Sequence, residues 1–366
     1  MIRSEVAPGD PLRGAFGCVS ARSELSQRCP CPTECGHHVQ PADERRHKRL
    51  KTHTRNNGKD RAVFDCVSLP RPVYPGSLCL ITRRCTHRQF LLRPDPETVN
   101  AFIYCLAIAA HRHEIDILDV IQMSNHLHDV IFDRHGNAPA FYADFHRLLA
   151  KCVNVIRCRW ENFFSSEQTS VVRIETMVDL IDRLVYVATN PIKAGLVARV
   201  DDWPGVSGFR SLLSGKPLHA TRPKYFFSED GVMPDEVTLY MTWPAELSDR
   251  DEVLAEVEAR VAQVERDKAA ELKRVGRRVL GRRAVIHQSW SGAPTTYEPR
   301  RQTQRTIAAR CKWTLFEALQ RKRDFIAGYR KARSALLSGI PIPFPHGTYW
   351  LRRFAGVEVG LSQILN

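Results

Sequence analysis

The order of the apolar segments between residues 77 and 190 constrains the fold more than any other feature of the sequence. Some segments are short and β-branched, and others are longer with apolar residues at helical spacing. The predicted strands cover 77–84, 115–123, 126–133 and 169–175, and the predicted helices cover 94–113, 137–160 and 176–190. The order strand–helix–strand–strand–helix–strand, followed by a further helix, predicts an α+β domain. Its core would be a ferredoxin-like antiparallel sheet with helices on one face.

The rest of the chain divides by composition. Residues 1–70 are rich in Pro, Gly, Ser, Arg and His without a sustained apolar period, which predicts a disordered basic segment. The domain with recognisable strand and helix patterns spans 71–210, and an irregular connector with short strand-like pieces follows at 211–248. Residues 249–366 are predicted to be mainly helical and basic. That last region could contact a DNA backbone, or it could be a protein–protein module that forms a homodimer.

The charge balance of the chain favours a polyanionic partner. Its 366 residues carry 54 Lys and Arg against 40 Asp and Glu, a net charge of +14. Such an excess fits nucleic acid or an anionic surface. No apolar run approaches the roughly 20 residues that span a bilayer, and the first residues lack the apolar core of a signal peptide. The 11 cysteines are therefore expected to be reduced thiols of a cytoplasmic protein. The Cys/His cluster at 29–38 matches none of the usual paired zinc patterns.

Two histidines stand one residue apart at the start of the strand 126–133. Because side chains alternate along a strand, His126 and His128 point to the same face, and Leu127 points to the other. Two imidazoles a few ångströms apart could share a metal ion. They could equally be surface histidines in a polar turn.

The helix 176–190 carries a tyrosine outside its apolar stripe. Tyr186 shares the polar face with Arg183 and Asn190, at spacings of three and four residues. Phenol is a poor nucleophile without a metal or a cation nearby. Arg183 could supply a positive charge, and the Asn190 amide could complete a metal site with the two histidines. Alternatively, Tyr186 is an amphipathic surface residue hydrogen-bonded to a neighbour.

Taken together, the two motifs resemble a known family. The pairing of "MSNHLH" (123–128) with "YVATNP" (186–191) resembles the single-tyrosine HUH transposases, specifically the REP-associated tyrosine transposases. The segments "NPIKAGLV" (190–197) and "WPGVSGF" (203–209) match those that usually follow. The resemblance covers roughly residues 71–210, with its motifs in the family's order and on the expected elements.

The resemblance implies a site and a reaction. His126 and His128 would be the HUH metal ligands, Asn190 the third ligand, and Tyr186 the catalytic nucleophile. The implied enzyme is a DNA transposase that cleaves and rejoins single-stranded, hairpin-bearing DNA through a 5′-phosphotyrosine link. The open coordination positions suit Mg²⁺ or Mn²⁺.

Other interpretations share the same residues. A domesticated or inactive relative would bind DNA without cleaving it, and an HUH replication initiator or relaxase would use the same histidine pair. Two positions depart from the family pattern: Ser124 replaces a common proline, and Asp129 replaces a hydrophobic residue. By alternation, Asp129 faces away from the histidines, and a buried carboxylate there would need a partner.

Candidate DNA contacts lie mainly on the polar face of the helix 137–160. Arg147, Lys151 and Arg157 follow that face, and Arg183 lies on the helix of Tyr186. These residues could follow a phosphate backbone, or they could form ordinary solvated faces. Three aromatic residues at or just after the end of the helix, at 160, 163 and 164, could stack on unpaired bases or belong to the core.

Overall fold

The computed structural model describes residues 70–228, 231–247, 249–297 and 305–361, and forms an α+β fold around a mixed five-stranded sheet. Two predictions concern the N-terminal segment 1–70: that it is disordered, and that it contains a Cys/His cluster. Except for Pro70, this segment lies outside the described residues. Within the described ranges, none of the helices is both long and apolar enough to cross a membrane.

The sheet has the order β2-β3-β1-β4-β7. Its antiparallel part consists of β1 (Ser77–Arg84), β2 (Asp116–Met123), β3 (His126–Asp133) and β4 (Ser170–Ile174). The fifth strand, β7 (Ile307–Ala308), pairs with β4 in parallel, so the sheet is mixed and not purely antiparallel. β7 lies in a segment whose composition predicts helix, and two residues are too few to show a strand period.

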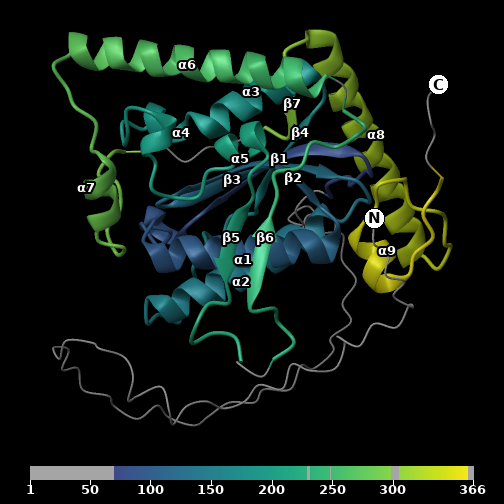
Figure 1. Cartoon of the computed structure of the whole chain (residues 1–366). Helices are drawn as coiled ribbons and strands as arrows, with labels where there is room; N and C mark the ends of the chain where they lie inside the picture. Colours follow the sequence, from purple (N-terminus) through teal and green to yellow (C-terminus); the bar gives the residue numbers. More distant parts are fainter. Residues whose placement is uncertain (1–69, 229–230, 248, 298–304, 362–366) are drawn as a thin grey trace, which may run out of the picture. The chain divides into compact units, whose positions relative to one another are not determined.

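Helices α1 (Pro96–His113) and α2 (Ala138–Ile156) cover one face of the sheet (Figure 1). Asp95 caps α1, its side chain accepting the Thr98 N–H. α2 ends before the predicted limit at residue 160, because Cys158 takes a left-handed backbone conformation with φ of 52°.

The opposite face carries α3 (Met177–Ala188), which contacts β2 and β3, and the long helix α6 (Arg250–Arg274) packs against α3 (Figure 1). An ion pair joins the two helices, with Arg260 Nη1 at 3.0 Å from Asp182 Oδ1. α3 is therefore covered on both sides, and its polar positions are not all in solvent.

The remaining elements are short, except for the basic helix α8. They are α4 (Asn190–Lys193), α5 (Phe209–Ser214), β5 (Leu218–Thr221), β6 (Glu236–Leu239), α7 (Arg282–His287), α8 (Lys312–Leu337) and α9 (Trp350–Ala355). β5 and β6 form a separate antiparallel pair against α1, within the segment predicted to be an irregular connector with short strand-like pieces.

The segment 203–209 lies along the free edge of β2. The Gly208 N–H donates to the Val120 carbonyl at 2.8 Å, and the Trp203 indole donates to the Gln122 carbonyl at 3.0 Å. A Cβ on Gly208 would stand 2.7 Å from Asp119 Oδ1, so the close approach requires glycine. The "WPGVSGF" segment thus closes the sheet edge next to the histidine strand.

Candidate active site

The two histidines lie side by side at the start of β3, on the face that α3 covers. His128 pairs with Thr82 of β1 across the sheet. The two imidazole rings are perpendicular, with centroids 4.9 Å apart. The alternation predicted from the sequence is confirmed, since Leu127 between them is buried on the opposite face.

Neighbouring side chains orient both rings. Asn125 Oδ1 lies 2.7 Å from His126 Nδ1, and the Asn125 amide nitrogen donates to the Arg88 carbonyl at 3.3 Å. An amide oxygen only accepts, so Nδ1 of His126 carries a proton. Thr82 Oγ1 lies 2.8 Å from His128 Nδ1 and, as a hydroxyl, suits either tautomer of that ring.

His128 is held in its neutral form. Its side chain is buried, and this burial, together with the nearby His126, keeps its pKa well below the usual value. A neutral imidazole has a lone pair that can accept a proton or bind a metal ion.

Tyr186 reaches the histidines from α3. Its hydroxyl lies 3.4 Å from His128 Nε2, and the two rings meet edge-on with centroids 5.1 Å apart. Sequence spacing places Tyr186 on the polar side of its helix, with the hydroxyl pointing outward. In the structure the hydroxyl points to His128, because α3 packs onto the sheet beside β3 and is not a helix with one face in solvent.

A lysine absent from the sequence-based site lies over the tyrosine. Lys193 Nζ is 5.7 Å from the centroid of the Tyr186 ring. Desolvation lowers the pKa of this ammonium group. Lys193 follows Tyr186 by seven residues, which is two helical turns. α4 continues the path of α3 after a single cap residue, Thr189, so this spacing could have indicated from the sequence that Lys193 lies beside Tyr186.

Asn190 begins α4, one turn after Tyr186, and is half-buried. Thr189 has φ of −91° and ψ of 3°, which keeps the chain close to helical across the junction. Tyr186 and Asn190 therefore stay on the same side of the path, as their spacing predicts.

The four predicted DNA contacts have different surroundings. Arg147, on α2, bonds to Asp144, and Lys151 is exposed on the same helix. Arg157 is buried, and its Nη2 lies 2.5 Å from Asp95 Oδ2. Its role is therefore structural, because its side chain lies below the surface. Arg183 lies on α3, and its Nε is buried without a hydrogen-bond partner in the part of the chain that the structure describes. α2 lies on the face of the sheet opposite to α3 (Figure 1), and the Tyr186 hydroxyl of α3 is the group that contacts His128.

The metal donors that the sequence predicts are the two imidazoles of β3 and the amide of Asn190, which begins α4. Among the described residues no group of three or more His, Cys, Asp or Glu side chains could hold a metal. Asp129 adds no ligand: it is buried on the opposite face, and its carboxyl oxygens have no hydrogen-bond partner within the described ranges. Burial raises its pKa well above the usual value, and the nearby Asp119 adds to this shift. Two imidazoles in their neutral forms, together with an amide oxygen, are donors that suit a divalent cation with open coordination positions.

Comparison with known proteins yields a structural similarity but no sequence match. No family model and no curated protein sequence matches the chain. A solved structure of a REP-associated tyrosine transposase bound to a REP hairpin is similar with a TM-score of 0.35 and 18% sequence identity. The match covers 40% of this chain and 86% of that one.

Proposed function

We propose that this protein is a DNA transposase that cleaves and rejoins single-stranded, hairpin-bearing DNA with Tyr186 as the nucleophile. The observation that carries the proposal is the 3.4 Å approach of the Tyr186 hydroxyl to His128 Nε2, beside the ring of His126. A tyrosine from α3, two histidines from β3 and a lysine from α4 meet there, which is more than a surface tyrosine requires.

The proposed reaction exchanges one phosphate ester for another. The Tyr186 oxygen attacks the scissile phosphorus and forms an O–P bond, while the bond to the 3′ oxygen breaks. The phenolic proton is lost, and the departing 3′ oxygen takes up a proton to become a hydroxyl. Because the 5′-phosphotyrosine retains the ester energy, attack by a 3′ hydroxyl rejoins the strand without ATP.

The chain's own residues prepare the phenol for this step. An ordinary phenol titrates near pH 10, so attack at neutral pH needs a lone pair or a positive charge close to the oxygen. The neutral His128 ring lies against the hydroxyl, and the Lys193 ammonium over the ring favours developing negative charge.

A divalent metal fits the same residues. His126, His128 and Asn190 would hold Mg²⁺ or Mn²⁺, with the Asn125 side chain fixing the orientation of the His126 ring. The lone pair of His128 would then be used by the ion, and the Lys193 ammonium would remain the protein group that favours negative charge on the Tyr186 oxygen. When bound, the ion would polarise the scissile phosphate and offset its charge.

We further infer that residues 71–210 form a ferredoxin-like catalytic domain and that the basic region 249–366 assists DNA binding. The strand order β2-β3-β1-β4 supports the first inference, and the exposed lysines and arginines of α8 support the second. The contacts of α6 with α3 and of β7 with β4 mean that 249–366 also stabilises the catalytic fold.

Adduct formation with end-labelled DNA tests the proposal. Hairpin-bearing single-stranded DNA, labelled at its 3′ end, is incubated with Mg²⁺ or Mn²⁺ and resolved on a denaturing protein gel. The 3′ label should move with the protein, whereas a 5′ label should leave as a shorter strand. Tyr186→Phe should abolish the adduct while DNA binding persists, and the control Tyr240→Phe, at an exposed tyrosine, should leave it intact.

Three results would contradict the proposal or its metal site. An adduct in the Tyr186→Phe variant would place the nucleophile elsewhere. DNA binding without any adduct in the wild-type protein would favour a DNA-binding relative that has lost the reaction. For the metal, adduct formation in excess chelator would exclude the assigned role of His126, His128 and Asn190.

A further inference from the structure

A basic segment, residues 277–288, follows α6 and contains α7; we call it the strap (Figure 1). Around it, residues 272–297 include six lysines and arginines and no aspartate or glutamate. Like charges placed so close together repel one another, and a bound polyanion removes that repulsion. The composition of the strap therefore favours an anionic partner.

Backbone hydrogen bonds fix the first part of the strap beside the end of α4. The Leu280 N–H donates to the Gly195 carbonyl at 3.0 Å, and the Gly281 N–H donates to the next carbonyl along the chain at 2.8 Å. Gly281 has φ of 88°, a conformation that glycine adopts readily, and the chain turns there into α7. Gly195 comes two residues after Lys193, the cation over the ring of the proposed nucleophile.

The last residue of the strap is held at the turn that leads into β3. Ser124 Oγ donates to Gln288 Oε1 at 3.4 Å, and the Gln288 carbonyl accepts a hydrogen bond from Arg93 Nη1 at 2.9 Å. Ser124 comes two residues before His126. Between the two ends, Val285 is fully buried in the hydrophobic core. The strap is therefore a packed part of the fold, and each end is bonded to a residue two positions from the candidate active site.

While Val285 anchors the strap, its basic side chains are exposed. The exposed arginines of the strap are Arg277, Arg278, Arg282 and Arg283. Within the ranges that the structure describes, none of these four forms an ion pair with a carboxylate. Arginines on the neighbouring helices differ: Arg260 of α6 pairs with Asp182 at 3.0 Å, and Arg321 of α8 pairs with Glu175 at 2.8 Å. Exposed guanidinium groups without a carboxylate partner suit phosphate oxygens.

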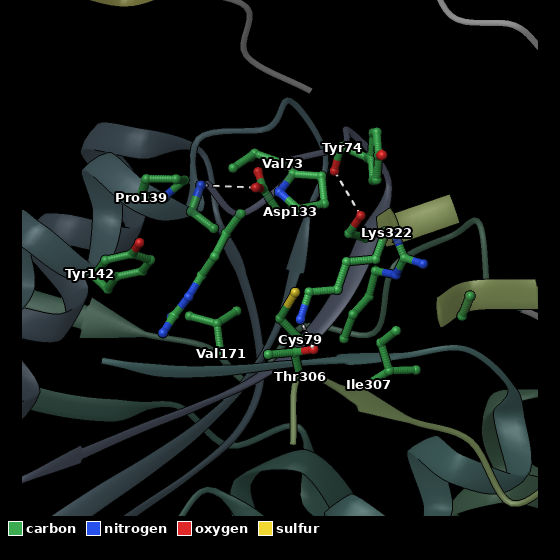
Figure 2. A pocket seen from close by; sticks show the side chains of 16 residues that line it. Val73, Tyr74, Cys79, Asp133, Pro139, Tyr142, Val171, Thr306, Ile307 and Lys322 are labelled. Atoms are coloured by element: carbon green, nitrogen blue, oxygen red, sulfur yellow. Dashed lines mark hydrogen bonds between the residues drawn. The ribbon is translucent and has the colours of Figure 1, made fainter. Parts of the chain in front are cut away.

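The cavity in Figure 2 does not extend this surface. It lies on the opposite face of the sheet, because Cys79 and Val171 of its lining point away from His128 by alternation. Its volume of about 90 Å³ is too small for a nucleobase, since roughly 150 Å³ admits benzene. Lys322 in its lining is half-buried and donates to Thr306 Oγ1 at 2.8 Å. The strap, in contrast, presents its cations to solvent on the side of the candidate active site.

We propose that the strap binds the phosphate backbone of single-stranded DNA next to the active site. The strand is the one that Tyr186 cleaves, an identification that rests on the proposed function. Guanidinium groups contact the phosphates of any sequence, so the strap holds and orients the strand without reading its bases. Because both ends of the strap are bonded beside the site, the phosphates that it binds lie close to the scissile one.

A salt titration of DNA binding tests the strap without any need for cleavage. The full chain with Tyr186→Phe is titrated into the fluorescein-labelled hairpin-bearing strand, and fluorescence anisotropy gives the affinity at several salt concentrations. Each lost phosphate contact to a single strand should lower the slope of log affinity against log salt by about 0.7. At 0.1 M salt the same loss weakens binding about fivefold.

Two double variants remove charges from the strap: Arg277→Gln with Arg278→Gln, and Arg282→Gln with Arg283→Gln. Each should lower the slope by about 0.7–1.4 and weaken binding at 0.1 M salt about 5–25-fold, according to whether one or both arginines contact phosphate. The matched control, Lys216→Gln with Lys224→Gln, removes the same charge from exposed positions that flank β5 and should leave the slope unchanged. All six positions are exposed, so the melting temperatures should match that of the parent protein.

Photocrosslinking tests the position of the strand. Benzoylphenylalanine in place of the exposed Ala284, within α7, should crosslink to the labelled strand. The same group in place of Lys216 should not crosslink, because that position lies outside the strap.

The outcomes separate the strap from the proposed reaction. An unchanged slope in both strap variants, or an absent crosslink at Ala284, would overturn the strap as a DNA contact even if Tyr186 forms its adduct. An equal fall of the slope in the strap and control variants would also overturn it, because such a fall would reflect net charge alone. DNA binding through the strap without any adduct in the wild-type protein would instead count against the proposed function alone.

Discussion

Asp119 should make the stability of the protein fall as pH rises through the neutral range. Its carboxyl group is buried on β2, with Oδ1 accepting the Val120 N–H at 2.8 Å and Oδ2 without a hydrogen-bond partner among the described residues. Burial raises the pKa of Asp119 from 3.8 to about 8. The folded carboxyl group therefore keeps a proton at pH values where the unfolded one has released it.

The sign and size of the effect follow from proton linkage. Between the unfolded pKa of 3.8 and the folded pKa of about 8, the folded state binds one proton more than the unfolded state. Each unit of pH then lowers the free energy of unfolding by about 1.4 kcal/mol. From pH 5 to pH 7 the loss attributable to Asp119 is about 2.7 kcal/mol.

Asp119→Asn isolates this contribution. Asparagine keeps the shape and the acceptor for Val120 but does not titrate. Urea unfolding at pH 5, 6 and 7 should show that the variant loses about 2.7 kcal/mol less than the wild type over this interval. Asp129 titrates in both proteins, and the exposed Asp202→Asn variant serves as a control with the wild-type slope. Parallel pH dependences for wild type and Asp119→Asn would show that Asp119 is ionised in the folded protein and refute the reasoning.

Three further predictions concern stability and catalysis. Arg157→Met removes the buried cation from Asp95, which is half-buried and keeps its ion pair with Arg93, and should destabilise the fold by about 1.5–3 kcal/mol in urea unfolding. A salt titration of DNA binding should keep its slope, and a reduced slope would place Arg157 on the DNA. Gly205→Ala puts a Cβ 2.7 Å from the Trp203 indole nitrogen and should cost about 1–3 kcal/mol, whereas an unchanged melting temperature would mean that the 203–209 segment moves freely. Lys193→Met should slow adduct formation at saturating DNA roughly tenfold, since the cation over Tyr186 is worth about 1–2 kcal/mol, while Lys216→Met, at an exposed site, should not change the rate.

Local pattern was sufficient for much of the architecture. β1 covers 77–84 and β3 covers 126–133 as predicted, and α3 lies within the predicted helix 176–190. Hydrophobic periodicity depends only on neighbours along the chain, so it is visible before any tertiary contact is known. The common face of His126 and His128 follows from the same rule, because alternation is a property of the strand itself.

Long-range packing decided the rest. A two-residue strand such as β7 has no period of its own and exists because β4 presents an edge to it. The burial of Arg157 and Asp119, and the approach of Tyr186 to His128, depend on which elements lie next to them. Spacing places a residue on a face of its own helix or strand, but only the packing of the elements determines what that face meets, and whether a charge is solvated, paired or buried as a neutral group.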